Sequence, residues 1–455
     1  MPVVLASALF MDLLDTAALG SALPSMAREF GTDPLHLRLA LTSYLITAAI
    51  LVPASGWLAD RLGARRLFVG AMALFMLGSV TCGLTNSIEQ LVAARVLQGI
   101  GGAMMTPVAR MIVIAATPRQ SLIRALNAFT LPAILGPLLG PLVAGFLLEV
   151  ANWRWIFFIN LPIGAIGICA VLGIVPKIPK VVTGKFDLAG FIAASVTILS
   201  LMVVAESIGT DLWSVHITAA AVVTAGLSMT TLVWLSRRSP TPILDLNLLT
   251  RPTFRASMVG GGVARIAMGA TPFLIPLFLQ VGLGWSPLRS GVVMMSMMVG
   301  SLLARYVGTQ SVRHLGFRST LIWTASMTGL FALLPSTFTG ATPLAVVVAV
   351  LFGLGLTRAA HFVPCSALAY ADVPPQEVSR ASTLATVIQQ MTLSFGVSIA
   401  GLLLYTFRSG PTLHLKDFTG PFLVLGLLSL GGVLAYLHLD RHVGLHMRYG
   451  AEKHD

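Results

Sequence analysis

The sequence predicts an all-α protein that crosses a lipid bilayer many times. Of its 455 residues, 56% are hydrophobic and only 10% are charged, and the mean hydropathy is +0.87. In a typical soluble domain, about a quarter of all residues are charged. Apolar runs recur along the whole chain, and each is long enough to cross a bilayer core of about 30 Å as a helix. Because backbone polar groups in lipid must bond within the chain, such runs predict a helical bundle rather than an open sheet.

Fourteen segments have the length and composition of membrane-spanning helices. In chain order they cover residues 3–25, 38–58, 68–86, 91–114, 125–148, 155–174, 188–208, 215–235, 256–280, 288–308, 319–338, 343–365, 384–406 and 420–440. The connections are short, and none has room for a soluble domain. We expect residues 1–174 to form an N-terminal six-helix bundle and residues 251–440 a C-terminal one. Residues 175–250 would supply a linker and two inserted helices, and residues 441–455 a cytoplasmic tail.

Basic residues are concentrated in the connections on one side of the predicted membrane. With the N-terminus inside, eighteen lie on the cytoplasmic side: Arg61, Arg65, Arg66, Arg119, Arg124, Lys177, Lys180, Lys185, Arg237, Arg238, Arg251, Arg255, Arg313, Arg318, Arg380, Arg441, Arg448 and Lys453. Six lie on the other side: Arg28, Arg38, Arg154, Arg289, Arg408 and Lys416. This bias predicts an even number of helices with both termini in the cytoplasm, and we expect a multi-pass protein of the inner (plasma) membrane. It also accounts for most of the net charge of +12, so we expect the lipid bilayer and no nucleic acid as a partner.

Several classes of protein are disfavoured by missing motifs. The chain has no nucleotide-binding loop, nucleophile motif or Cys/His metal spacing, so we expect no enzyme, no ATP-driven pump, no metal site and no cofactor. The three cysteines, Cys82, Cys169 and Cys365, fall in or beside predicted spans, so a disulfide framework is not expected. The first segment lacks a basic n-region and a cleavage site, so we expect it to be a membrane span rather than a cleaved signal peptide.

Two basic, glycine-containing connections are similar to each other. The stretch "GWLADRLGARRLF" (56–68) follows the second span, and "ARYVGTQSVRHLGFRSTL" (304–321) follows the tenth. This weak repeat predicts two related halves. Transporters built from such repeats place their substrate site near the membrane midplane between the halves.

The first of these connections resembles the loop signature of the major facilitator superfamily, G-x-L-a-D-r-x-G-r-k. The matching residues are Gly56, Leu58, Asp60, Arg61, Gly63 and Arg65, whereas Ala64 departs from the pattern. Asp60 could accept hydrogen bonds from a neighbouring helix N-terminus, and the arginines could bind it and the lipid headgroups. The resemblance implies a gating loop that latches the cytoplasmic side. A basic loop that only sets the topology is the alternative.

Two further motifs of this superfamily follow. The stretch "LVAARVLQGIGGAMM" (91–105) resembles its fourth-helix motif, with Arg95, Gln98, Gly99, Gly101 and Gly102. The stretch "GPLLGPLVAGF" (136–146) resembles its fifth-helix antiporter motif through Gly136, Gly140, Pro141 and Gly145, although Ala144 replaces a glycine. Small residues allow helices to approach closely, so general helix packing could also produce this pattern. Within the superfamily, the resemblance implies an exporter.

Three more stretches narrow the resemblance to the fourteen-helix drug:proton antiporters of the EmrB/QacA type, which include MdtD-like and HsrA-like transporters. They are "LLDTAALGSALP" (13–24), "NWRWIFFINLPIG" (152–164) and "FLQVGLGWSPLRSG" (278–291). The resemblance covers nearly the whole chain. It implies the major facilitator fold, with two six-helix bundles, two inserted helices and a proton gradient as the energy source.

Two aspartates, Asp12 and Asp15, stand within the first apolar segment. Because they are three residues apart, they share one face of a helix. Burial and mutual repulsion both favour the protonated form of a carboxyl group, so this pair predicts proton coupling. The resemblance assigns that role to Asp15, and Asp12 is not part of the family pattern. Each could instead be structural, paired with an arginine in the membrane. Glu206, near the outer end of the seventh span, is expected to reach water.

The predicted spans also contain several cationic side chains. Arg110 and Arg305 fall near cytoplasmic ends, where they can reach the headgroups. Arg95, Arg265 and Arg358 lie deeper, where arginine is costly. We expect a substrate cavity lined by Arg95, Gln98, Arg265, Gln280, Arg358 and His361. The arginines favour an anionic or zwitterionic substrate, unless they pair with Asp12, Asp15 or helix carbonyls.

The leading hypothesis is a proton-coupled exporter that works as a monomer by alternating access. Its substrate would be a small molecule of the amphipathic, multidrug class. The alternative is efflux of a small organic anion, such as a citrate-like carboxylate or its metal complex. An importer of organic acids and a membrane sensor are further possibilities, but the sensor lacks a soluble domain that would transmit a signal.

Overall fold

The computed structural model describes residues 1–118, 121–176, 178, 186–207, 214–239, 241–374, 376–410 and 412–440. The described residues form helices and no strand, which confirms the predicted all-α class. The predicted tail 441–455 lies outside the described residues, as do Arg119, Lys177, Lys180 and Lys185 and the side chain of Arg305.

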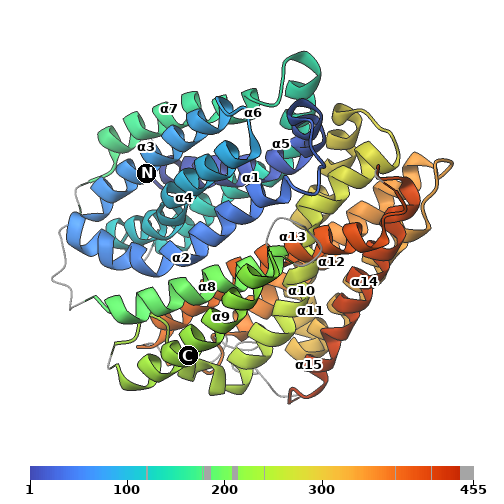
Figure 1. Ribbon diagram of the computed structural model, residues 1–455. Coiled ribbons are helices and arrows are strands. Elements are labelled where there is room, and N and C mark those ends of the chain that lie inside the picture. The colour runs from blue at the N-terminus through green and yellow to red at the C-terminus, as the bar shows by residue number, and fades with distance from the viewer. Residues whose placement is uncertain are drawn as a thin grey trace. The chain divides into compact units, whose positions relative to one another are not determined.

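The chain divides into two compact units (Figure 1). Unit 1 comprises Met1–Leu232 with Trp285–Val292, and unit 2 comprises Val233–Gly284 with the chain from Val293 onward. Unit 1 holds α1 (Pro2–Phe30), α2 (Arg38–Leu62), α3 (Ala64–Gly83), α4 (Ile88–Ala116), α5 (Leu122–Val150), α6 (Trp155–Phe158), α7 (Asn160–Ile174), α8 (Leu188–Ser207) and most of α9 (Val215–Arg238). The domain boundaries predicted at residues 174 and 250 stay predictions.

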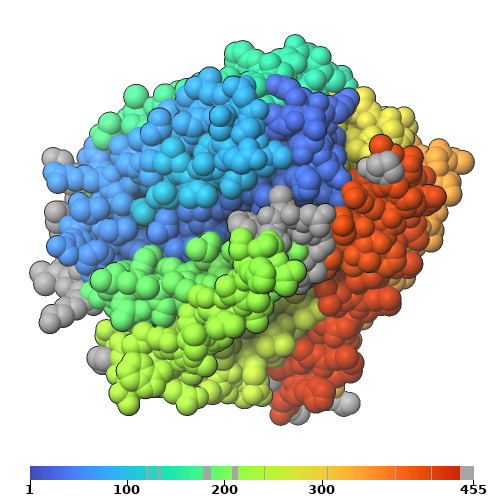
Figure 2. Space-filling model, in the orientation of Figure 1, coloured from blue at the N-terminus to red at the C-terminus, as the bar shows by residue number. Residues whose placement is uncertain are grey.

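Unit 2 holds the other helices. They are α10 (Pro252–Leu277), most of α11 (Pro287–Leu333), α12 (Leu344–Leu368), α13 (Val378–Phe407), α14 (Thr419–Gly431) and α15 (Val433–Leu437). Short helical turns connect them: η2 (Leu246–Thr250), η3 (Phe278–Gly282), η4 (Leu334–Thr337) and η5 (Leu415–Phe418). Part of the visible surface of unit 2 belongs to α14 and α15 (red in Figure 2), which expose Leu423, Leu427 and Leu434. Apolar side chains exposed in this way suit contact with lipid tails rather than with water.

Small residues place the helices of unit 1 against one another. Helix α1 packs against α5, and α3 packs against α4. A Cβ atom added at Gly136 of α5 would lie 2.9 Å from the Phe10 carbonyl oxygen of α1, and one at Gly140 would lie 2.7 Å from the Cβ atom of Ala17. Likewise, a Cβ atom at Gly78 of α3 would lie 2.5 Å from the Cα atom of Gln98 in α4. These contacts bring the backbones of α3 and α4, and of α1 and α5, close together, which positions the side chains of the site below.

Thirteen helices of the described chain are long and apolar enough to cross a membrane. The remaining predicted span, 319–338, falls in the second part of α11 and in η4. The connection predicted between the tenth and eleventh spans is largely helical, because α11 is interrupted only at Gly316 (φ 80°). Gly63, between α2 and α3, also has a positive φ of 94°. Such backbone conformations favour glycine, so the two similar connections of the sequence are similar tight turns.

Candidate functional site in the membrane-spanning helices

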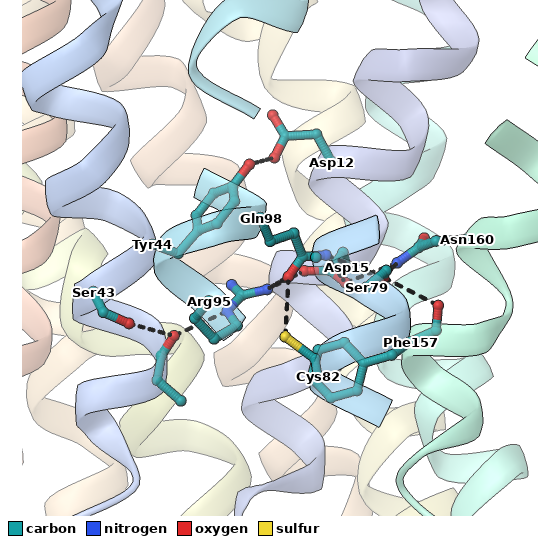
Figure 3. Close-up of polar contacts among 12 residues, drawn as sticks. Asp12, Asp15, Ser43, Tyr44, Ser79, Cys82, Arg95, Gln98, Phe157 and Asn160 are labelled. Atoms are coloured by element: carbon teal, nitrogen blue, oxygen red, sulfur yellow. Dashed lines mark hydrogen bonds and ion pairs between the residues drawn. The ribbon is translucent and has the colours of Figure 1, made fainter. Parts of the chain in front are cut away.

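A buried hydrogen-bond network surrounds the carboxylate of Asp15 (Figure 3). Asp15 lies on α1, its side chain is fully buried, and it accepts hydrogen bonds from three side chains of other helices. Arg95 on α4 lies 2.5 Å from Oδ2, and Gln98, one turn further on, donates to Oδ1 at 3.0 Å. Asn160, at the start of α7, donates to Oδ1 at 2.8 Å. The network therefore stabilises an ionised Asp15 with one cation and two amides, in a place where an unpaired charge would be very costly.

A second layer fixes the amides that contact Asp15. The hydroxyl of Ser79 on α3 accepts bonds from Gln98 at 3.1 Å and from Asn160 at 2.8 Å, and it donates to the Phe157 carbonyl oxygen at 3.1 Å. This ties α3, α4, α6 and α7 to the same carboxylate of α1. Asn160 and Ser79 were not among the predicted site residues. The available signal was a polar side chain within an apolar segment, which did not reveal their shared partner.

Asp12 has different surroundings, although it is one turn from Asp15 on α1. It is partly exposed and accepts a hydrogen bond from the Tyr44 hydroxyl of α2. The Tyr44 ring in turn lies under the Arg95 guanidinium, 4.5 Å from the ring centroid. Arg95 Nε donates to the Ala40 carbonyl oxygen at 3.0 Å, while its Nη2 has no hydrogen-bond partner in the described chain. Tyr44 and Arg95 therefore link the two predicted proton-coupling acids.

A second buried ion pair lies within unit 1. Arg38 at the start of α2 is fully buried, and its Nε lies 2.7 Å from the Glu206 carboxylate at the end of α8. Its Nη2 also donates to the Glu206 carbonyl oxygen at 3.1 Å. The expectation that Glu206 reaches water is wrong, because only 3% of its surface is exposed. The sequence placed both residues near the outer ends of helices, but it did not show that α2 and α8 are neighbours.

In unit 2, Arg265 and His361 belong to a buried polar cluster. His361 on α12 lies 3.1 Å from the Thr324 hydroxyl through Nδ1 and 3.1 Å from the Tyr436 hydroxyl through Nε2. Arg265 on α10 donates to the Ser257 carbonyl oxygen at 3.4 Å, while its Nε has no partner in the described chain. Both predicted cavity residues are 3% exposed. In this unit they are packed inside the protein.

Arg358, by contrast, lines a cavity of unit 2. The cavity is partly open to its surroundings and is formed by residues of α10, α11, α12 and α14. Its other lining residues are Ala267, Met268, Ala270, Thr271, Leu274, Ile275, Thr328, Ala332, Leu354, Phe422 and Leu425. Gln280, the remaining predicted cavity residue, lies in η3 and is partly exposed. An arginine near the centre of a membrane helix costs about 2.5–3.5 kcal/mol to insert, so a functional role is the default reading for Arg358.

The predicted gating loop forms the turn between α2 and α3. Arg61 stacks on the Trp57 ring at 5.0 Å, and Arg65 donates to the Leu172 carbonyl oxygen near the end of α7. Asp60 is partly exposed in the last turn of α2, and Gly56 lies one turn earlier. The partner proposed for Asp60 stays a prediction.

The predicted antiporter motif lies within α5. Gly136 and Gly140 face α1 as described above, and Pro141 is one of three prolines inside the helix. A Cβ atom at Gly145 would lie 2.7 Å from the Pro287 carbonyl oxygen at the start of α11, which also belongs to unit 1. The motif glycines therefore allow α5 to pack closely against two helices, α1 and α11.

Ion pairs inside a bundle of membrane-spanning helices, with cationic side chains at mid-helix, are typical of secondary transporters. The model of the Major Facilitator Superfamily matches residues 5–248 and 257–446, and the chain belongs to that superfamily. It is a membrane transporter of small molecules and not an enzyme.

Relatives refine this assignment. The "Putative multidrug resistance protein MdtD" of Pectobacterium carotovorum subsp. carotovorum (strain PC1) is 39% identical over 410 residues, covering 89% of this chain and 86% of the relative. The protein of the same name from Salmonella paratyphi A (strain ATCC 9150 / SARB42) is 38% identical over 409 residues, with the same coverage. These matches confirm the predicted resemblance to the drug:proton antiporter family with its MdtD-like members.

Solved structures support the fold alone. A D-xylose-proton symporter has a TM-score of 0.69 at 15% identity, covering 97% of this chain and 98% of that one. The peptide transporter POT in complex with sulfate has a TM-score of 0.70 at 16% identity, covering 97% and 95%. The predicted major facilitator fold is therefore confirmed.

Proposed function

We propose that this transporter exports amphipathic small molecules from the cell in exchange for protons, by alternating access in the inner membrane. In this proposal the protein works as a monomer with both termini in the cytoplasm. The observation that carries the proposal is the pair of carboxylates on α1. Asp15 is held by Arg95, Gln98 and Asn160, whereas Asp12 is partly exposed and bonded to Tyr44.

The two acids differ in how easily a proton reaches them. Asp12 is the accessible group, so it accepts a proton first. Protonation of Asp15 converts a carboxylate into a neutral carboxyl group, which removes its ion pair with Arg95. A buried arginine without its counter-ion is unstable, so the helices α1 and α4 are biased toward another arrangement. A substrate that prefers one of the two arrangements is then coupled to the proton.

Names of relatives agree with this direction of transport. The MdtD proteins of Pectobacterium and Salmonella carry multidrug resistance in their names, which is a property of cells that export drugs. The glycines of the fifth-helix motif, Gly136, Gly140 and Gly145, lie in contacts of α5 with α1 and α11. Such contacts are expected of a motif that controls helix packing during the transport cycle.

Reconstituted protein tests proton coupling. In proteoliposomes with a pH gradient, we expect wild-type protein to move ethidium, an amphipathic cation, against its concentration gradient. Asp12→Asn and Asp15→Asn should each abolish this uphill transport, because an amide cannot carry the proton. Downhill exchange of ethidium should persist in folded variants. Glu149→Gln is the matched control, since Glu149 is an exposed carboxylate at the end of α5.

The outcome against the proposal is equally concrete. If both aspartate variants drive ethidium uphill as well as the wild type does, neither acid is the proton carrier. Uptake into everted and right-side-out vesicles separately fixes the direction, and uptake only into right-side-out vesicles would identify an importer.

Efflux of a small organic anion is the second candidate function. It is favoured by α10 and α12 of unit 2, which contain Arg265 and Arg358 but no aspartate or glutamate. Radiolabelled citrate transport by Arg265→Ala and Arg358→Ala variants tests it. Unchanged citrate efflux in both variants would count against a citrate-like substrate.

A further inference from the structure

We propose that the cavity of unit 2 binds an amphipathic organic monoanion, with Arg358 as the residue that recognises its carboxylate. This inference rests on the proposed transport function and adds amphipathic monoanions to the amphipathic compounds, such as ethidium, that the transport test uses. It gives Arg358 and Arg265 different roles, although the sequence predicts both of them as residues of the substrate cavity.

The first step is the charge of Arg358. From residue 251 to residue 371 the sequence contains no aspartate or glutamate. Arg358 makes no ion pair in the part of unit 2 that the structure describes, in contrast to Arg38 and Arg95 of unit 1. It is partly exposed and is among the residues that line the cavity. An anion entering the cavity would supply the missing counter-charge.

The second step is the chemistry of the remaining wall. Thr271 and Thr328 are the other polar lining residues, and both hydroxyls donate to carbonyl oxygens of their own helices, at 3.3 Å to Ala267 and 2.7 Å to Thr324. The remaining lining residues are aliphatic, apart from Met268 and the aromatic Phe422. Arg358 is therefore the one lining side chain whose donors are not already used within the described cavity.

These two steps decide between types of anion. A citrate-like substrate carries several charges, and each needs its own donors when it leaves water. The cavity offers one cation and an apolar wall, which suits one carboxylate on an apolar body. Pockets with mostly apolar walls and a single well-placed charge fix the orientation of such ligands.

The position of Arg265 supports the same conclusion. Its guanidinium lies in the buried cluster with Ser257, and a Cβ atom added at Gly261 would lie 3.1 Å from its Nη1 atom. Arg265 is 3% exposed and is not among the residues that line the cavity. We therefore assign Arg265 to the packing of α10 rather than to recognition of the ligand.

Binding of 2-naphthoate to the purified full-length protein tests the inference. Its neutral isostere 2-naphthamide and citrate serve as comparison ligands, and isothermal titration gives the three affinities. Wild-type protein should bind 2-naphthoate at least about tenfold more tightly than the amide or citrate, as expected for a hydrogen bond between charged groups. Arg358→Gln should remove this preference while leaving the affinity for the amide within about twofold. Arg358→Lys should retain part of it.

Control variants separate charge recognition from folding. Arg265→Gln and Arg289→Gln should keep the wild-type preference, since Arg289 is an exposed arginine stacked on Trp285. Ala332→Phe, which fills the cavity without touching the charge, should weaken binding of acid and amide alike. If Arg358→Gln does not fold, Arg358→Lys and Ala332→Phe still decide the question.

Three results would overturn the inference: no preference for naphthoate in the wild type, a preference that survives Arg358→Gln, or one that is lost in Arg265→Gln alone. Failure of the transport proposal is distinguishable from these. If uphill transport is absent while the preference depends on Arg358, the binding site stands and the proton-coupling proposal fails. Binding that is retained in Asp15→Asn likewise supports a site independent of the proton carrier.

Discussion

The two units of this transporter treat buried charge in opposite ways. In unit 1, Arg95 contacts Asp15 and Arg38 contacts Glu206, so each of these buried arginines has its own carboxylate. In unit 2, Arg265 and Arg358 lie in helices without any acidic residue. A charge paired within the protein holds helices together and responds when its partner is protonated. A charge without a carboxylate partner in the protein is available to a ligand, as we infer for Arg358. Where no ligand reaches it, as for Arg265, it lowers the stability of the folded protein.

The same units agree closely at their turns. Gly63 of unit 1 and Gly316 of unit 2 both have positive φ angles. Two residues later, Arg65 donates to the Leu172 carbonyl oxygen near the end of α7, and Arg318 donates to the Leu437 carbonyl oxygen at the end of α15 at 2.9 Å. In each unit a helix end is therefore tied to the first turn after a glycine. The similar turns indicate that both units need a tight connection between two helices. The different pairing of their buried arginines agrees with the different roles that we propose, proton coupling in unit 1 and ligand binding in unit 2.

The largest effect is expected from removing Arg95. Arg95→Gln leaves the buried Asp15 without its cation, and breaking a buried ion pair from one side costs about 3–5 kcal/mol. Arg265→Gln removes a buried charge that has no counter-ion, so we expect a much smaller loss or a gain. Free energies of unfolding from SDS titration, followed by tryptophan fluorescence, measure both.

A double variant sharpens this test. Adding Asp15→Asn to Arg95→Gln removes the unpaired carboxylate, so part of the lost stability should return. Equal losses for Arg95→Gln and Arg265→Gln would show that pairing does not distinguish the two units.

The Arg38–Glu206 pair should show the next largest effect. Glu206→Gln leaves the fully buried Arg38 without an anion, and we expect a loss near the lower end of the same range, about 3 kcal/mol, because the pair lies at helix ends. Glu206 also accepts through its backbone, a bond that the substitution keeps. The double variant with Arg38→Gln gives the coupling energy. Additive losses would mean that the two side chains do not stabilise each other.

These pairs mark the limit of what the sequence could predict. The all-α class and the apolar helices follow from the length of the apolar runs, and the turn at Gly63 follows from its motif. The partner of Asp15 lies 80 positions away on α4, and the partner of Glu206 lies 168 positions away on α2. Which helices are neighbours, and which face each one turns inward, depends on contacts such as Gly136 against Phe10. For the same reason, the sequence predicted the same cavity role for Arg265 and Arg358. What surrounds each of them is set by residues of other helices, which the sequence does not show.

Substituting the turn glycines tests the likeness of the units. Gly63→Ala and Gly316→Ala force a side chain into a backbone conformation that costs about 1–3 kcal/mol. We expect similar losses in the two variants, measured by the same SDS titration. Gly410→Ala is a suitable control, because no positive φ is present there and a Cβ atom would meet nothing within 4 Å. Clearly unequal losses would show that one of the two turns is not under the same constraint.

The smallest effects concern the arginines that follow these glycines. Arg65 and Arg318 each place a cation against carbonyl oxygens at a helix C-terminus, an interaction worth about 0.3–1 kcal/mol. Arg65→Gln and Arg318→Gln should each lower stability by that amount, whereas Arg66→Gln, at an exposed position beside Arg65, should not. Because each contact lies within its own unit, we expect the losses in the double variant to add. A coupling energy well above the measurement error would mean that the two contacts stabilise each other. The two turns would then not be independent structural features of their own units.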